Sequence, residues 1–243
     1  MFAFRTTHGP VGRSVELAFT DRFGGVSAAP YDELDLAVAR DDDPDDLGRA
    51  RAENLRRVLA EIAPGAGLAD LRQVHGCEVV TADGPVDRAP GDGIVTTRTD
   101  VVLMVRAADC VPVLLSGGTV VGAAHAGRAG VATGVVPATV ARMRELGGSD
   151  VVAWIGPHVC GGCYEVPERM QGEVGAVEPA TVATTTWGTP SLDLGAGVRA
   201  QLERDGVEVV DVARCTVESP DLYSHRRDGR DAGRHAGFVR RVR

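Results

Sequence analysis

Two histidines and one cysteine stand in similar surroundings. His75 lies in Gln-Val-His-Gly, Cys110 in Ala-Asp-Cys-Val-Pro and His125 in Ala-His-Ala-Gly. Each is expected at or near the end of an apolar strand, beside small residues, where backbones come close and polar side chains can converge. Two imidazoles and a thiolate suit zinc or copper, and three protein ligands with an open fourth position are typical of catalytic zinc.

The residues alone leave three interpretations of this set open. The separations of 35 and 15 residues match no local metal signature. His75, Cys110 and His125 can form a metal site, or they can be unconnected core and hydrogen-bonded residues. The third interpretation is a Cys110 nucleophile whose thiolate is formed by His125 as the base.

The basic residues favour anion binding by arginine alone. The chain contains no lysine, so a P-loop lysine and a Schiff-base lysine are both excluded. Arginine can grip phosphate with two parallel hydrogen bonds. Arg226 and Arg227, in Tyr-Ser-His-Arg-Arg-Asp-Gly, and Arg22, in a Gly-Gly turn, are candidates for phosphate binding, although each could equally belong to a surface turn. Asn54 is the only asparagine, and it joins the candidate substrate-binding residues.

The five cysteines do not indicate a disulfide framework, because their number is odd and no signal peptide is recognisable. Cys160 and Cys163 form a single C-x-x-C. A zinc ribbon needs a second pair of cysteines, which the chain lacks. The zinc deaminase signature is missing too, since no histidine is followed two residues later by glutamate. We therefore expect a tight glycine turn at 160–163, and no role for Cys77 or Cys215.

Composition predicts one soluble domain over residues 1–243. Hydrophobic residues make up 44% and charged residues 25%, as in globular proteins, and no apolar run reaches the ~18 residues of a membrane helix. The net charge of −8 disfavours nucleic acid and anionic membranes as partners. We expect a cytoplasmic protein, a monomer or homodimer, whose partners are small molecules.

Hydrophobic patterning predicts an α/β or α+β fold with buried sheets. No G-x-G-x-x-G follows a strand and opens a helix, so a dinucleotide-binding fold has little support. The expected helices cover 46–60, 130–146, 167–177 and 194–205. The expected strands cover 14–20, 71–74, 77–81, 101–105, 111–115, 119–124, 151–155, 207–212 and 237–242.

Eight short motifs then occur in an order that resembles a known family. They are Asp-Arg-Phe-Gly-Gly-Val-Ser (21–27), Gln-Val-His-Gly (73–76), Ala-Asp-Cys-Val-Pro-Val-Leu-Leu (108–115), Ala-His-Ala-Gly (124–127), Gly-Pro (156–157), Cys-Tyr-Glu-Val (163–166), Cys-Thr (215–216) and Tyr-Ser-His-Arg-Arg-Asp-Gly (223–229). Together they resemble the multicopper polyphenol oxidase, or laccase-domain, family, which is also described as purine nucleoside phosphorylase and as peptidoglycan editing factor. The resemblance runs from about residue 14 to the last residue.

The resemblance implies a layered α-β-β-α sandwich with mixed sheets, similar to folds of Cys/His hydrolases. It implies a metal site of His75, Cys110 and His125 that holds zinc, or copper in some members, with Cys110 and His125 also catalytic. The implied function is phosphorolysis of adenosine, inosine and methylthioadenosine, with nucleoside and phosphate as partners and adenosine deamination as a further activity. The implied alternatives are a hydrolase that edits peptidoglycan precursors and weak copper-dependent phenol oxidation.

Two features of the chain qualify this resemblance. The family usually has an aromatic residue after Ala-His-Ala-Gly, whereas here Arg128 follows and offers a planar cation to an anionic substrate. Only six histidines are present, and a four-copper laccase needs roughly ten. A conventional laccase is therefore excluded. With Arg128 included, the candidate substrate-binding residues are Arg22, Asn54, Arg128, Arg226 and Arg227.

Overall fold

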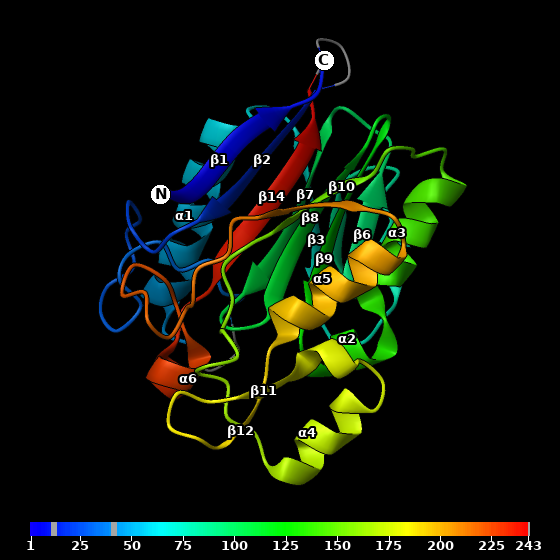
Figure 1. The fold of residues 1–243 in the computed structure, drawn as a ribbon. Helices are drawn as coiled ribbons and strands as arrows, with labels where there is room; N and C mark the ends of the chain where they lie inside the picture. The colour runs from blue at the N-terminus through cyan, green and yellow to red at the C-terminus, as the bar shows by residue number, and fades with distance from the viewer. Residues whose placement is uncertain (11–13, 40–42, 243) are drawn as a thin grey trace.

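The computed structural model describes residues 1–10, 14–39 and 43–242, and in it two six-stranded sheets pack face to face (Figure 1). The first sheet has the order β1 (Phe2–His8), β2 (Val15–Thr20), β14 (His235–Arg241), β7 (Val101–Ala107), β3 (Gly67–Arg72) and β5 (Val86–Pro90). The second has the order β13 (Glu208–Asp211), β10 (Val152–Ile155), β8 (Val111–Gly117), β9 (Val120–Ala126), β6 (Gly93–Thr96) and β4 (Val79–Thr81).

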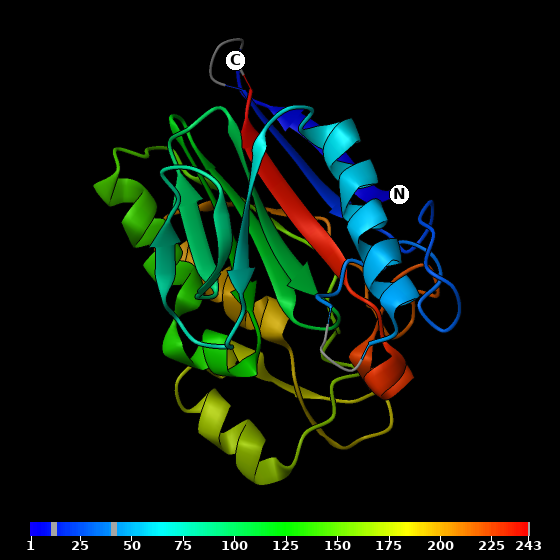
Figure 2. The ribbon, with the colours of Figure 1, turned by 180° about the vertical axis from the view of Figure 1, so that it is seen from behind.

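Helices cover the outer faces of both sheets. Helix α1 (Asp45–Ile62) lies across the first sheet, as Figure 2 shows. The second sheet is covered by α2 (Arg128–Thr133), α3 (Val135–Glu145) and α5 (Leu194–Arg204). The remaining elements are α4 (Glu168–Gly175), the hairpin of β11 (Val182–Thr184) and β12 (Pro190–Leu192), α6 (His225–Asp228) and the 3₁₀ turns Pro179–Thr181 and Gly229–Asp231.

Three apolar layers hold these elements together. Phe19 and Leu103 of the first sheet meet Leu114 and Trp154 of the second in the layer between the sheets. A second layer lies under α1 and a third under α2, α3 and α5. Since each fully buried large apolar side chain contributes about 2 kcal/mol, these layers are the main stabilising force. The expected α-β-β-α sandwich with mixed sheets is confirmed.

The structure corrects three of the expected elements near the site. Residues 73–78 form a loop between β3 and β4, where strands were expected over 71–74 and 77–81. The amides of Val74 and Gly76 donate to a side chain, Asp92 Oδ2, and so are not available to a sheet ladder. The single helix expected over 130–146 is split into α2 and α3 at Gly134, whose φ of +80° ends a right-handed helix.

Several strands escaped the sequence patterns. Strand β1 is a half-exposed edge strand that pairs only with β2, β5 carries charged residues and ends in proline, and β6 has four residues. Short and edge strands carry little alternation to detect. Among the described residues, no helix is long and apolar enough to cross a membrane.

A buried histidine gives the fold a predictable dependence on pH. His235, at the start of β14, is fully buried, and burial lowers its pKa to about 4. In the unfolded chain this histidine has an ordinary pKa and binds a proton more readily. The stability contributed by neutral His235 is therefore fully present above pH 6.5 and is lost as the pH falls toward 4.

We therefore expect His235→Gln to weaken the pH dependence of folding stability. When the pH falls from 7 to 5, protonation linked to His235 should lower the unfolding free energy of the unsubstituted protein by about 2 kcal/mol. The unfolding free energy of the variant should fall by about that much less. Urea unfolding at both pH values measures the two differences. Equal pH dependence in the native and variant chains would contradict the assignment.

Candidate metal centre and active site

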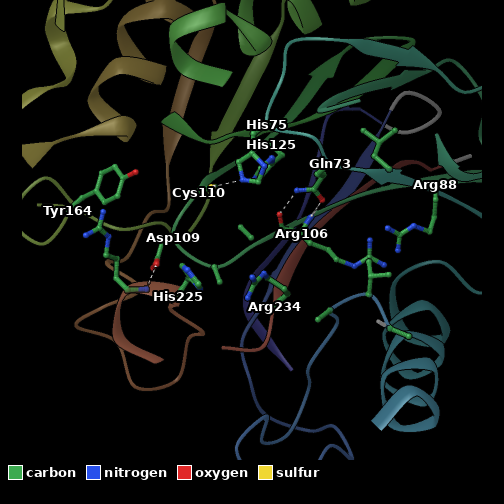
Figure 3. Close-up of a pocket in the computed structure, with 17 residues that line it drawn as sticks. Gln73, His75, Arg88, Arg106, Asp109, Cys110, His125, Tyr164, His225 and Arg234 are labelled. Atoms are coloured by element: carbon green, nitrogen blue, oxygen red, sulfur yellow. Dashed lines mark hydrogen bonds between the residues drawn. The ribbon is translucent and has the colours of Figure 1, made fainter. Parts of the chain in front are cut away.

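The structure brings His75, Cys110 and His125 together. One ring nitrogen of each histidine and Cys110 Sγ all lie within 4.8 Å of one another, and Cys110 Sγ is 3.9 Å from His75 Nε2. The two imidazole rings meet edge to face, with centroids 4.8 Å apart. Figure 3 shows the three side chains at one wall of a pocket. The triad therefore comes from three separate segments of the chain.

Each member is placed by a strand end. His75 lies in the loop after β3 with a φ of +61°, in the left-handed region. Cys110 lies in the short connection from β7 to β8, which crosses from one sheet to the other. His125 lies near the end of β9, fixed by the β9 ladder with β8. Strand ends at one edge of the sandwich thus converge on a single point.

Asp92 ties these segments to one another. The carboxylate is buried, and its Oδ1 lies 2.8 Å from His125 Nδ1. Its Oδ2 accepts hydrogen bonds from the backbone amides of Val74 and Gly76 at 3.1 and 2.7 Å. Its carbonyl oxygen also accepts the amide hydrogen of His125 at 2.7 Å. With Nδ1–H held by the carboxylate, Nε2 is the nitrogen of His125 that is available to a metal.

Asp92 could not be recognised from the sequence. The residue lies between Gly91 and Gly93, just before β6, a strand that the patterns did not reveal. A buried carboxylate behind a metal-binding histidine is a common feature of metal sites, but its distance along the chain is not fixed. The only available signal was an acidic residue enclosed by two glycines.

The charges of the site favour a thiolate and an imidazolium when no metal is present. Burial alone would raise the pKa of Cys110, but the charge of His125 and hydrogen bonds from His125 and His75 lower it to about 6. Burial would lower the pKa of His125, but the Cys110 thiolate and Asp92 raise it to about 9. Burial also opposes ionisation of Asp92, yet His125 and the loop amides leave its pKa lowered.

This donor set fits zinc or copper. The 3.9 Å between Cys110 Sγ and His75 Nε2 is close to the ~3.6 Å that zinc–sulfur and zinc–nitrogen bond lengths imply for tetrahedral ligands. Gly127 leaves space beside them, because a Cβ there would lie 2.9 Å from His75 Cδ2 and 3.1 Å from Cys110 Sγ. Three protein ligands leave a fourth position for water or substrate.

The triad opens into a pocket of about 640 Å³ (Figure 3). The Gln73 side chain links the loop to β7. Its Nε2 donates to the Arg106 backbone carbonyl and its Oε1 accepts from the Arg106 backbone amide, both at 2.8 Å. The Arg106 guanidinium in turn contacts Asp70 and the Leu36 carbonyl. Cationic and hydrogen-bonding side chains make up much of the remaining wall: Arg88, Tyr164, His225, Arg226 and Arg234.

Arg226 lines this pocket, whereas Arg128 is not among the lining residues. The Arg226 guanidinium stands 4.6 Å from the centre of the Tyr164 ring, and its backbone amide donates to Asp109 Oδ2 at 2.6 Å. Burial and the Cys110 thiolate raise the pKa of Tyr164, while the charges of Arg226 and then Arg128 oppose that rise. The Arg226 guanidinium is therefore close enough to act on an anion near Tyr164.

The other candidate substrate-binding residues are placed elsewhere and bind the protein itself. Arg22 donates to the Asp32 carbonyl at 2.7 Å and stacks on Tyr223. The Arg227 guanidinium pairs with Asp228 and donates to the backbone carbonyls of Thr216, Ser219 and Leu222.

Asn54 is fully buried in α1 and holds a loop. Its Oδ1 accepts from the Val26 amide, and its Nδ2 donates to Ser27 Oγ and to the carbonyls of Glu33 and Asp35. An asparagine side chain has both donors and an acceptor, so it can bind a backbone amide and backbone carbonyls at the same time. Arg22, Arg227 and Asn54 thus contribute to folding, and none of them lines the pocket.

In the described part of the chain, which includes all six histidines, they do not gather into a multicopper cluster. His8 packs on Trp154 with centroids 5.0 Å apart, and His158 and His235 are buried outside the triad. His225 lines the pocket, but only His75 and His125 join Cys110. His75, Cys110 and His125 are therefore a candidate site for one metal ion.

The contacts of Asp92 predict that it positions His125 for metal binding. Asp92→Asn should weaken zinc binding at the triad by about 10- to 100-fold, because the amide no longer fixes the His125 tautomer. Competition with a chromogenic chelator measures this affinity. Asp87→Asn, an exposed aspartate on β5, is the matched control and should leave the affinity unchanged. Equal affinity in both variants would refute the role of Asp92.

Comparison with known proteins agrees with this architecture. Residues 16–242 match the family model described as multi-copper polyphenol oxidoreductase laccase. A solved Neisseria meningitidis protein of the DUF152 family superposes with a TM-score of 0.84 at 30% identity, covering 98% of this chain and 99% of that one. YlmD from Geobacillus stearothermophilus superposes with a TM-score of 0.81 at 28% identity, covering 94% and 92%.

Curated relatives carry the name of one activity. A protein of Streptomyces coelicolor named purine nucleoside phosphorylase is 51% identical over 91% of this chain and 93% of its own length. A Mycobacterium bovis protein of the same name is 43% identical over 95% and 94%. The cluster of two histidines and one cysteine does not match a multicopper centre, but the sequence match covers nearly the whole chain. The chain belongs to the multi-copper polyphenol oxidoreductase laccase family.

Proposed function

We propose that the protein is a zinc-dependent purine nucleoside phosphorylase that acts on adenosine, inosine and methylthioadenosine and also deaminates adenosine. The observation that carries the proposal is one pocket that holds both the His75, Cys110 and His125 cluster and a set of guanidinium groups. A phosphorylase needs a site for a phosphate dianion beside a site for the nucleoside. The names of the relatives support the same assignment.

Arg226 and Arg88 are the strongest candidates for phosphate binding. Within the described parts of the chain, neither guanidinium forms an ion pair with a carboxylate, although both line the pocket. Arg106, by comparison, is engaged by Asp70. The charge of Arg128, at the position where the family usually has an aromatic residue, also acts to lower the pKa of Tyr164. A guanidinium in a pocket wall can bind phosphate through two parallel hydrogen bonds.

Zinc bound at the position formed by His75, Cys110 and His125 would supply a Lewis acid. The protein's own residues prepare that position. Asp92 holds the His125 Nδ1 proton, so that Nε2 faces the pocket, and Gly127 keeps space beside Cys110. These groups would lie next to the purine or to the water that attacks it in deamination.

The phosphorolysis step exchanges one bond for another at the ribose. A phosphate oxygen bonds to the anomeric carbon as the bond from that carbon to the purine nitrogen breaks, and the purine leaves with the bonding electron pair and takes up a proton. Positive charge develops on the ribose in the transition state. Arg226 would hold the phosphate in line for attack, which contributes through proximity and orientation.

A second candidate is a Cys/His hydrolase acting on peptidoglycan precursors. Its supporting observation is that His125 lies between the Asp92 carboxylate and the Cys110 thiol. A nucleophile, a base and an acidic residue that orients the base form the arrangement used for acyl transfer. This mechanism needs neither zinc nor phosphate, which separates it from phosphorolysis.

The phosphorylase proposal predicts phosphate-dependent products from adenosine. Purified protein should release adenine and ribose 1-phosphate only when phosphate is present, as followed by mass spectrometry. His125→Ala should reduce the rate by more than about 100-fold, because it removes a metal ligand. Inosine formed without phosphate would report deamination in the same assay.

Arginine variants test the phosphate site. Arg226→Gln should raise the KM for phosphate by about tenfold or more, because a charge-assisted contact is lost, with a smaller change in the KM for adenosine. Arg230→Gln, which removes an exposed arginine in the following turn, is the matched control. No nucleoside cleavage by zinc-loaded native protein would sink the proposal. Amide hydrolysis that survives a chelator and is lost in Cys110→Ser would favour the second candidate.

A further inference from the structure

A second cluster of metal-ligating side chains lies outside the triad. Cys160, Cys163, Cys215 and Glu218 bring three thiols and one carboxylate so close that their ligand atoms all lie within 4.8 Å of one another. None of the cysteines is in a disulfide. The proposed function uses none of the four residues.

The spacing of the four residues reveals a pattern that was hidden in the sequence. Cys160 and Cys163 are separated by two residues, and so are Cys215 and Glu218. A zinc ribbon uses two such pairs, each a C-x-x-C. Here glutamate takes the place of the fourth cysteine, so the second pair could not be recognised from cysteines alone.

Local backbone geometry presents each pair from a tight turn. The Cys160 carbonyl accepts from the Cys163 and Tyr164 amides at 3.0 and 3.1 Å, and the Cys215 carbonyl accepts from the Ser219 amide at 3.0 Å. Gly161 permits the first turn to lie close to its surroundings, because a Cβ there would stand 2.9 Å from Asp193 Cβ. Such turns direct two side chains, three positions apart, toward one point.

The two turns are already joined by the backbone. His158 and Cys215 form a parallel bridge, in which the Thr216 amide donates to the His158 carbonyl at 3.0 Å. The Cys160 amide points at Cys215 Sγ, 3.5 Å away. Amide donors toward sulfur are typical partners of metal-bound thiolates, since they stabilise the negative charge.

We propose that Cys160, Cys163, Cys215 and Glu218 form a second metal site that holds a structural zinc ion. Three thiolates select a soft or borderline cation, and a carboxylate oxygen completes a four-coordinate zinc site. Four protein ligands leave no open position, so this site is structural, in contrast to the open triad. The three cysteines are half-buried and Glu218 is exposed, so that zinc can reach the site from solvent.

The second site would order one wall of the active pocket. Tyr164 directly follows Cys163, and the turn at 215–218 leads to α6, which carries Arg226. Tyr164 and Arg226 contact each other across the pocket wall. A zinc ion that joins the two turns would therefore hold the backbone that carries Tyr164 and Arg226 in place, without contacting substrate.

Metal content tests this proposal independently of catalysis. The full chain, purified with zinc and without chelators, is analysed by elemental mass spectrometry. Cys215→Ser should bind one zinc fewer per chain than the native protein, and Cys77→Ser, which alters a cysteine outside both clusters, should bind the same number. His125→Ala should keep the zinc of the second site, so loss of the triad metal cannot be mistaken for it.

Cobalt(II) provides a readout that does not depend on the folding of a variant. In native protein loaded with cobalt, thiolate-to-cobalt charge transfer should exceed that of a single thiolate, because the triad contributes one and the second site three. Glu218→Gln should weaken metal binding at this site by about tenfold. Glu208→Gln, which removes another exposed carboxylate, should not.

Three results would overturn the proposal. These are equal zinc content in native and folded Cys215→Ser protein, a cobalt spectrum with the intensity of a single thiolate, and a disulfide among the three cysteines in protein purified with zinc. None of these results depends on whether nucleosides are cleaved, so failure of the second site and failure of the phosphorylase proposal can be told apart.

Discussion

One buried carboxylate holds the active site in place. Asp92 is inaccessible to solvent, yet each of its carboxylate oxygens has a defined partner: Oδ1 binds His125 Nδ1, and Oδ2 binds the amides of the loop that carries His75. A buried carboxylate without these partners would cost free energy, so both sets of hydrogen bonds are strongly favoured. They fix His75 in the loop and His125 on β9 relative to one another. The geometry of the triad depends on this single group.

The sandwich supplies the frame on which this interaction rests. Strand β3 delivers the His75 loop, the crossing from β7 to β8 delivers Cys110, and β9 delivers His125. The first two come from the parallel pairing of β3 with β7, whose carboxyl ends lie at the same edge. Arginines from α6 and from β5 then add positive charge around the pocket. The His75, Cys110 and His125 cluster and several guanidinium groups therefore share one cavity.

Local patterns predicted most of the helices and central strands, whereas the grouping of His75, Cys110 and His125 was implied by the family resemblance and not by their spacing. Neither predicted the supporting contacts. Buried β-branched runs revealed β7 and β8, and small residues beside His75, Cys110 and His125 marked the strand ends that converge. Asp92 could not be found, because its partners are backbone amides and a histidine 33 residues away. Arg227 and Asn54 have side chains suited to binding substrate, but they bind backbone carbonyls that only the folded chain brings near. Residues with the right chemistry were thus easier to identify than their partners.

We propose that His75, Cys110 and His125 hold a metal ion beside bound phosphate. The most direct test is a crystal structure of the zinc-loaded chain with phosphate and a non-cleavable nucleoside, with anomalous data at the zinc edge. We expect an anomalous peak about 2.0–2.3 Å from His75 Nε2, Cys110 Sγ and His125 Nε2, with phosphate against Arg226. A triad without a peak, or phosphate bound outside the pocket, would contradict the account.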